Sequence, residues 1–164
     1  MRPTFFHGRL TLINWIRDIH ATTQWTTSVC TGAILLGLAG LLDGIEATTH
    51  WAYVDWLVGF GATAVNQRFV RSGKIVTAAG VAAGIDMALW LAGKIAGAEV
   101  AKRIQLALEY DPQPPFDSGN PQKASVKTRT AVAKRLCDNH VGEQLSAVRV
   151  SSDEGEFFPG GRTR

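Results

Sequence analysis

The chain is poor in cysteine: Cys30 and Cys137 are the only two among 164 residues. Cys30 lies in an apolar stretch and Cys137 in a polar one. Neither has a second cysteine at the spacing of metal ligands. A disulfide framework and a zinc site are therefore both disfavoured, and we expect no bound metal. A reducing cytoplasm is the location that fits these cysteines best.

Charge is also scarce, because charged residues make up 19% of the chain and the formal net charge is only +3. This balance gives little reason to expect nucleic acid or a membrane as a partner. Two apolar stretches, residues 29–42 and 75–100, have to be weighed as membrane spans. The first is too short, and Asp86 and Lys94 interrupt the second. A loose set of basic residues near the C-terminus is better explained as a solvated helix face: Lys123, Lys127, Arg129, Lys134 and Arg135.

Apolar spacing predicts an α/β fold. A helix over residues 10–20 is followed by a strand over 25–29 that ends just before Cys30, and then by a buried helix over 32–42. Later strands are expected at 47–50, 68–71 and 74–78, and later helices at 53–57, 84–96, 98–109 and 128–136. A hairpin turn at Ser72-Gly73 joins two of these strands, and Gly97 breaks two of these helices. The alternation favours a mostly parallel sheet between helices.

A change of composition after Tyr110 predicts the domain organisation. The prolines that follow Asp111 end the helical pattern and begin an extended arm. From about Ser118 the chain is polar, and its last dozen residues have the composition of a disordered end. We therefore expect a domain over residues 1–121 and a polar, partly disordered tail over residues 122–164.

The predicted turn from strand to helix at Cys30 is the strongest functional signal. A thiol attacks as its thiolate, and the unpaired N–H groups of a helix N-terminus favour that negative charge. Thr31 could donate a hydrogen bond to the sulfur or the substrate, its N–H could bind an oxyanion, and Gly32 would let a substrate approach closely. The competing interpretation is that Cys30 is only a small buried hydrophobic residue.

His50 is the best-placed histidine, at the end of the predicted strand over residues 47–50. There it could hydrogen-bond Cys30 or polarise a substrate, with Trp51 walling the pocket. The alternative is a histidine that only bridges loop backbone. Four core carboxylates are available as its partner, and none is convincing: Asp43, Glu46, Asp55 and Asp86. Asp43 is better interpreted as a turn residue and Asp86 as a helix cap.

Several blocks, in order, resemble the ThiJ/PfpI (DJ-one-like) superfamily, which has the class I glutamine amidotransferase-like, flavodoxin-like fold. They are residues 28–33 (SVCTGA), 39–44 (AGLLDG), 47–51 (ATTHW), 79–86 (AGVAAGID) and 105–112 (QLALEYDP). The resemblance runs from about Leu10 to about Pro121. The block at residues 109–116 is particularly similar to isocyanide hydratase-like members.

The resemblance implies a small-molecule lyase without a cofactor. In it, Cys30 attacks the carbon of an isocyanide, Thr31 assists, and water completes an N-formamide. Similar proteins often form dimers, so a homodimer is one assembly to expect. Members normally carry a βαβ portion before the helix at residues 12–20, with an acid that hydrogen-bonds the cysteine. The expectation is thus a truncated domain in which the missing acid impairs turnover. A ligand-sensing domain related to AraC-type regulators and a non-catalytic fragment remain as alternatives.

Overall fold

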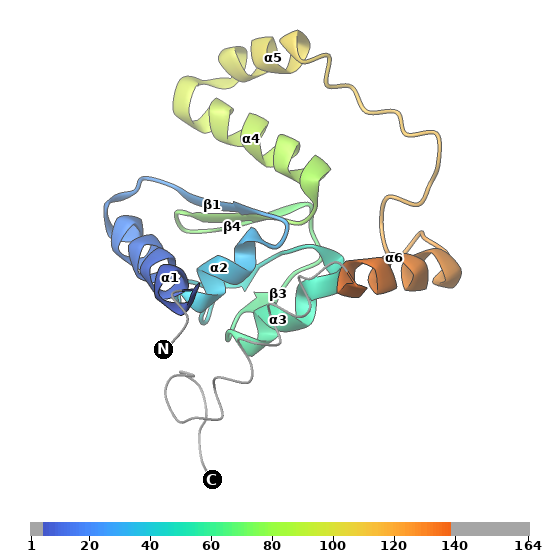
Figure 1. The fold of residues 1–164 in the computed structure, drawn as a ribbon. Coiled ribbons are helices and arrows are strands. Elements are labelled where there is room, and N and C mark those ends of the chain that lie inside the picture. Colours follow the sequence, from blue (N-terminus) through green and yellow to red (C-terminus); the bar gives the residue numbers. More distant parts are fainter. Residues whose placement is uncertain (1–4, 139–164) are drawn as a thin grey trace. The chain divides into compact units, whose positions relative to one another are not determined.

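The computed structural model describes residues 5–138 (Figure 1). The chain divides into two compact units, Met1–Asp111 and Pro112–Arg164. Every strand of the described residues belongs to the first unit. No helix in the described part of the chain combines the length and the apolar character needed to cross a bilayer.

The main sheet has three strands in the order β1-β5-β4. The strands are β1 (Thr26–Val29), β4 (Phe69–Ser72) and β5 (Ile75–Ala78). β1 runs parallel to β5, with Thr26 opposite Ile75 and Val29 opposite Ala78. β4 and β5 form the antiparallel hairpin that the Ser72-Gly73 pair predicts, and Gly73 has the positive φ of +61° that such a tight turn favours.

Helices cover both faces of this sheet. Successive side chains of β1 point to opposite faces of the sheet, so Ser28 faces one layer of helices and Val29 faces the other. A Cβ on Gly32 would lie 3.5 Å from Ser28 Cβ, which places α2 (Gly32–Leu38) on one face. A Cβ on Gly84 would lie 2.8 Å from Val29 Cγ1, which places α4 (Val81–Ala96) on the other. The predicted layered α/β arrangement is confirmed.

The segment after α2 departs from the predicted single sheet. The expected strand over residues 47–50 is only β2 (Glu46–Ala47), and it pairs in parallel with β3 (Thr63–Ala64), which the sequence did not predict. Between them lie the 3₁₀ helix η1 (Trp51–Tyr53) and α3 (Val54–Gly59). The strand stops at Ala47 because the next residues, Thr48 and Thr49, use side-chain hydrogen bonds in place of a ladder.

Two buried apolar clusters hold the first unit together. The larger cluster lies around α2, α3 and the second sheet, and it consists of Ala33, Leu36, Leu42, Ala47, Leu57, Ala62 and Ile75. Ile16 on α1 (Phe5–Thr22) packs against this cluster. The smaller lies between β5 and α4: Val76, Ala78, Ala83 and Met87. The two clusters meet the sheet from opposite sides, so most of the burial surrounds β5.

The α4–α5 hairpin contrasts with this core. The predicted helix break is confirmed at Gly97, which has a φ of +90°, and α5 (Ala98–Ala107) follows it. No residue of α5 is buried, and Leu106 is 79% exposed. In the second unit α6 (Val126–Asp138) confirms the helix predicted over residues 128–136. The predicted disordered end falls outside the described residues.

Candidate functional site

Cys30 sits at the junction between β1 and α2, as the sequence predicts. Its backbone N–H donates to Ala78 O at 2.9 Å, so it continues the pairing of β1 with β5. Its φ is +57°, a left-handed conformation in which a non-glycine residue is strained. Such strain persists only where the surroundings enforce it, and it is found most often at functional sites. The side chain is half-buried.

Buried threonines hold this strained turn in place. Thr49 Oγ1 donates to Cys30 O at 2.8 Å, and Ala33 N donates to the same carbonyl at 3.4 Å. One residue earlier, Thr48 N donates to Thr77 Oγ1 at 2.9 Å, and Thr77 is only 1% exposed. The segment over residues 48–49 is therefore joined to the carboxyl ends of β1 and β5, although it does not extend their sheet.

Thr31 and Gly32 begin the helix after Cys30. Both are half-buried, and the structure gives their backbone N–H groups no acceptor among the described residues. Thr31 makes no side-chain cap. Two unpaired N–H groups directly after the cysteine are suited to an oxyanion. A Cβ on Gly32 would meet only Ser28 at an ordinary contact distance, so packing inside the chain leaves this position unconstrained.

His50 bridges loop backbone, which is the second of its two sequence interpretations. Its Nδ1 accepts from Ala52 N at 3.3 Å and caps η1. Its ring lies 5.6 Å from that of Trp51 and 6.0 Å from that of Tyr53, so two aromatic rings lie beside the imidazole. Burial lowers the pKa of His50. The imidazole is thus neutral near pH 7, with Nε2 as its donor, and among the described residues no hydrogen bond joins it to Cys30.

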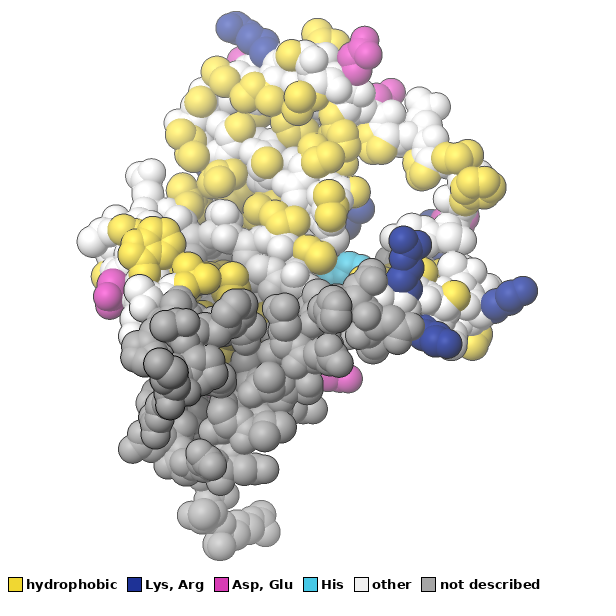
Figure 2. All heavy atoms as spheres, in the orientation of Figure 1, with side chains coloured by type: hydrophobic (Ala, Val, Ile, Leu, Met, Phe, Trp, Pro, Cys, Tyr) yellow, Lys and Arg dark blue, Asp and Glu magenta, His cyan; other side chains and the backbone are white. Residues whose placement is uncertain are grey.

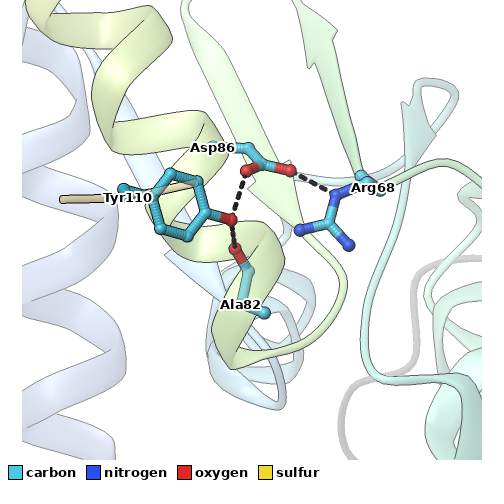
Figure 3. A network of polar contacts seen from close by, with 4 residues as sticks. All are labelled: Arg68, Ala82, Asp86 and Tyr110. Carbon is cyan, nitrogen blue, oxygen red and sulfur yellow. Dashed lines mark hydrogen bonds and ion pairs between the residues drawn. The ribbon is translucent and has the colours of Figure 1, made fainter. Parts of the chain in front are cut away.

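Of the core carboxylates, Asp43 lies in a turn as predicted, whereas Asp86 does not have its predicted role. Asp86 is not a helix cap, because α4 begins five residues earlier at Val81. Its Oδ2 accepts from Arg68 Nε, and its Oδ1 accepts from Tyr110 Oη at 2.7 Å (Figure 3). Tyr110 Oη also lies 3.4 Å from Ala82 O. Asp43, Glu46 and Asp55 are exposed, and none is hydrogen-bonded to Cys30 within the described residues.

The Arg68–Asp86–Tyr110 network shifts the titration of its members. Burial alone would raise the pKa of Asp86, but the hydrogen bonds from Arg68 and Tyr110 and the charge of Arg68 hold it below its usual value. The hydrogen bond to Asp86, together with burial, raises the pKa of Tyr110. Sequence reasoning missed Arg68 and Tyr110. They stand 18 and 24 residues from Asp86, and no local motif signals the contacts.

One peptide unit connects this network to the cysteine. Ala78 O accepts from Cys30 N, and Ala79 N donates to Arg68 O at 2.9 Å. Cys30, Thr49 and the backbone of Arg68 therefore converge at the carboxyl end of β5. The described residues contain no group of three or more His, Cys, Asp or Glu side chains placed to hold a metal ion.

These features define an α/β protein with a strained cysteine between a parallel strand and a helix. The model of the DJ-1/PfpI family matches residues 2–94, more than half of the chain. The chain belongs to the DJ-1/PfpI family. The resemblance found in the sequence is thereby confirmed.

Three named proteins are similar to this chain. Isonitrile hydratase of Pseudomonas putida is 46% identical over 137 residues, which cover 75% of this chain and 60% of the hydratase. The HTH-type transcriptional regulator CdhR of Pseudomonas aeruginosa is 30% identical over 80% of this chain and 39% of the regulator. A crystal structure of a ThiJ/PfpI family protein from Pseudomonas syringae has a TM-score of 0.73 at 40% identity, covering 77% of this chain and 52% of that one. The chain spans at most 60% of the length of these relatives.

Proposed function

We propose that Cys30 is the nucleophile of an isonitrile hydratase-type reaction, the conversion of an isocyanide into an N-formamide. The observation that carries the proposal is the φ of +57° at Cys30, imposed between a paired strand and a helix. The 46% identity to isonitrile hydratase supports the choice of reaction. Because the match covers only 60% of that hydratase, the activity has to be tested on this chain itself.

The chemistry is an addition followed by a hydrolysis. The thiolate of Cys30 forms a bond to the terminal carbon of the isocyanide, and a proton adds to the same carbon, which gives an S-linked thioformimidate. Water then adds to the carbon–nitrogen double bond. The carbon–sulfur bond breaks, the thiol is restored, and the product is the N-formamide. The sum is isocyanide plus one water, with no oxidation or reduction.

The neighbouring residues are assigned roles that agree with their geometry. The unpaired N–H groups of Thr31 and Gly32 would stabilise the thiolate and the oxyanion formed when water adds. His50 would act as a neutral donor through Nε2, because Nδ1 is occupied by Ala52 N. Trp51 would form an apolar wall for the isocyanide substituent.

The test compares the two cysteines. The purified chain is incubated with an aryl isocyanide, and N-formamide is measured by chromatography with mass detection. We expect Cys30→Ala to abolish turnover and the matched control Cys137→Ala to retain it. Mild alkylation with peptide mapping should label Cys30 faster than Cys137 in the folded protein. Turnover that survives in Cys30→Ala would contradict the mechanism.

A second candidate function is ligand sensing without turnover. It is favoured by the 30% identity to a transcriptional regulator over most of this chain. The same preparations distinguish the two functions. Saturable binding of an isocyanide by the wild-type chain, with no formamide produced and no loss of binding in Cys30→Ala, would favour sensing over catalysis.

A further inference from the structure

An open groove lies between α4 and α5, the two helices of the hairpin. Its volume of about 430 Å³ lies within the range of about 300–1,000 Å³ that is typical of small-molecule sites. The apolar lining comes from Leu89, Trp90 and Gly93 on α4 and from Ala98 and Ala101 on α5. Figure 2 shows that hydrophobic side chains gather over this hairpin. The groove therefore offers an apolar surface of the size that a small organic molecule needs.

Packing within the chain fixes the shape of the groove. The Trp90 ring lies edge-on to that of Trp25, with the centroids 5.5 Å apart at 84°, and its centroid lies 5.7 Å from that of Phe69. A Cβ on Gly93 would lie 3.6 Å from the Cβ of Ala101, so the two helices approach closely there. This close approach narrows the groove, which suits an extended aliphatic chain better than a bulky ring. A surface that already has its bound shape loses less conformational entropy when a ligand binds.

The groove carries positive charge without a matching negative charge. Among the described residues that line it, the ionisable ones are Lys94 and Lys102, and none is an aspartate or a glutamate. Lys102 Nζ already donates to Glu99 Oε1 at 2.8 Å. No carboxylate of the described residues lies within ion-pair distance of Lys94, whose Nζ is instead 5.7 Å from the centroid of the Trp90 ring. The Lys94 ammonium is thus held beside the apolar wall and is free to pair with an anion.

A second cation adds to the positive field at the same ring. Arg71 Cζ lies 5.2 Å from the centroid of the Trp25 ring and 5.9 Å from that of Trp90. Arg71 Nε donates to Gly73 O, and within residues 5–138 the guanidinium has no carboxylate partner. Two like charges this close to one ring repel each other, and an anion bound at Lys94 would reduce that repulsion. The charge pattern therefore favours an anionic ligand over a neutral or cationic one.

We propose that this groove binds an amphipathic carboxylate, with a medium-length aliphatic chain along the apolar lining and the carboxylate group at Lys94. Burial of the chain supplies most of the affinity, because removal of each methylene group from water is favourable. The exposed ammonium adds a smaller selectivity for negative charge. No residue of the groove is among those assigned to the reaction at Cys30, so this site stands or falls independently of the proposed hydratase activity.

The first experiment measures the selectivity for charge by isothermal titration calorimetry of the full chain. Octanoate should bind saturably and about two- to fivefold more tightly than octan-1-ol, which is the contribution of an exposed ion pair. Octyltrimethylammonium should bind more weakly than either. Lys94→Gln should remove the advantage of octanoate and leave the affinity for octan-1-ol unchanged. The matched control Arg103→Gln removes a positive charge from an exposed position on α5 outside the groove and should change neither affinity.

A second experiment locates the bound chain. Ala98→Leu, at an exposed position on the groove wall, should fill part of the space and weaken the binding of octanoate and octan-1-ol alike. Thermal unfolding checks that this variant is folded. An octanoate analogue with a diazirine on its chain should, after irradiation, label peptides from α4 and α5 in a map by mass spectrometry. Excess octanoate should suppress this labelling.

Four results would overturn the proposal. They are the absence of saturable octanoate binding at millimolar concentration, equal affinities for the three octyl compounds, an octanoate affinity unchanged in Lys94→Gln, and labelling centred on the Cys30 elbow. The last of these would move the bound carboxylate to the candidate active site. None of the readouts depends on turnover, so an inactive chain that binds octanoate as described would contradict the proposed reaction and leave the groove site intact.

Discussion

The elbow at Cys30 and the α4–α5 hairpin are built on different principles. At the elbow, hydrogen bonds between residues far apart in sequence enforce one backbone conformation, and the threonines that make them are almost fully buried. In the hairpin, α5 buries no residue at all. Its end is held by Tyr110, which donates to a partly exposed carboxylate on α4.

The difference shows which region of this fold has its backbone conformation fixed most strongly. Buried hydrogen bonds are expensive to lose because the abandoned partner cannot turn to water, whereas exposed polar contacts exchange easily with solvent. Changes at the elbow should therefore affect both stability and chemistry. Changes in the hairpin should have small and local effects. The predictions that follow test this difference, beginning with the elbow and ending with the hairpin.

The largest effect is expected from Thr77→Val. The variant keeps the shape of the side chain but leaves the buried Thr48 N–H without its acceptor. We expect the free energy of unfolding to fall by about 1–3 kcal/mol, as measured by urea denaturation. Thr27→Val, at an exposed position on the neighbouring strand, is the matched control and should change little. Equal stability of the two variants would show that the elbow is not held by buried hydrogen bonds.

A smaller effect is expected from the strained φ of Cys30. Glycine adopts a left-handed φ without steric cost, whereas alanine there loses about 1–2 kcal/mol. Cys30→Gly should therefore be more stable than Cys30→Ala by about 1 kcal/mol, once the greater freedom of glycine in the unfolded chain is allowed for. Thermal and urea unfolding of the two variants measure the difference directly. A more stable alanine variant would rule out backbone strain at this position.

The smallest effect is expected in the hairpin. Tyr110→Phe removes one hydrogen bond to Asp86 and should lower the free energy of unfolding by no more than about 1 kcal/mol.

Asp86→Asn tests the same network through the pH dependence of stability. The folded-state pKa of Asp86 lies below its unfolded value, so its contribution is present above about pH 4 and is lost as the pH falls through the folded pKa. The stability gap between wild type and Asp86→Asn should be widest near neutral pH and close in acid. A gap that does not change with pH would exclude the ionised carboxylate as its source.

The sequence predicts the local parts of this molecule better than its long-range contacts. The strand before Cys30, the hairpin at Ser72-Gly73 and the break at Gly97 follow from turn chemistry and apolar period within a few residues. β3 was missed because two residues carry no periodic pattern. The partners of Asp86 were missed because tertiary folding alone brings Arg68 and Tyr110 to α4.

The candidate site likewise contains residues that a local motif predicts and residues whose role depends on long-range contacts. Cys30, Thr31 and Gly32 are contiguous, so a local motif is enough to nominate them. The support given by Thr49 and Thr77 depends on how separate segments meet at the end of β5, and buried threonines have no sequence signature that distinguishes them from exposed ones. The two interpretations of His50 also required the structure, because only the position of Ala52 N shows which ring nitrogen is occupied.

The close approach of Val29 to Gly84 has a consequence for how sequences of this kind can diverge. A methyl group at position 84 would fall 2.8 Å from a Val29 methyl group, so the two positions share one small volume. Enlarging residue 84 is compatible with the present spacing between α4 and the sheet only after residue 29 has become smaller. The order of substitutions therefore matters: a path that begins with Val29→Ala is open, while a path that begins with Gly84→Ala is obstructed. Since Val29 directly precedes Cys30, the helix across the sheet limits which neighbours Cys30 can acquire.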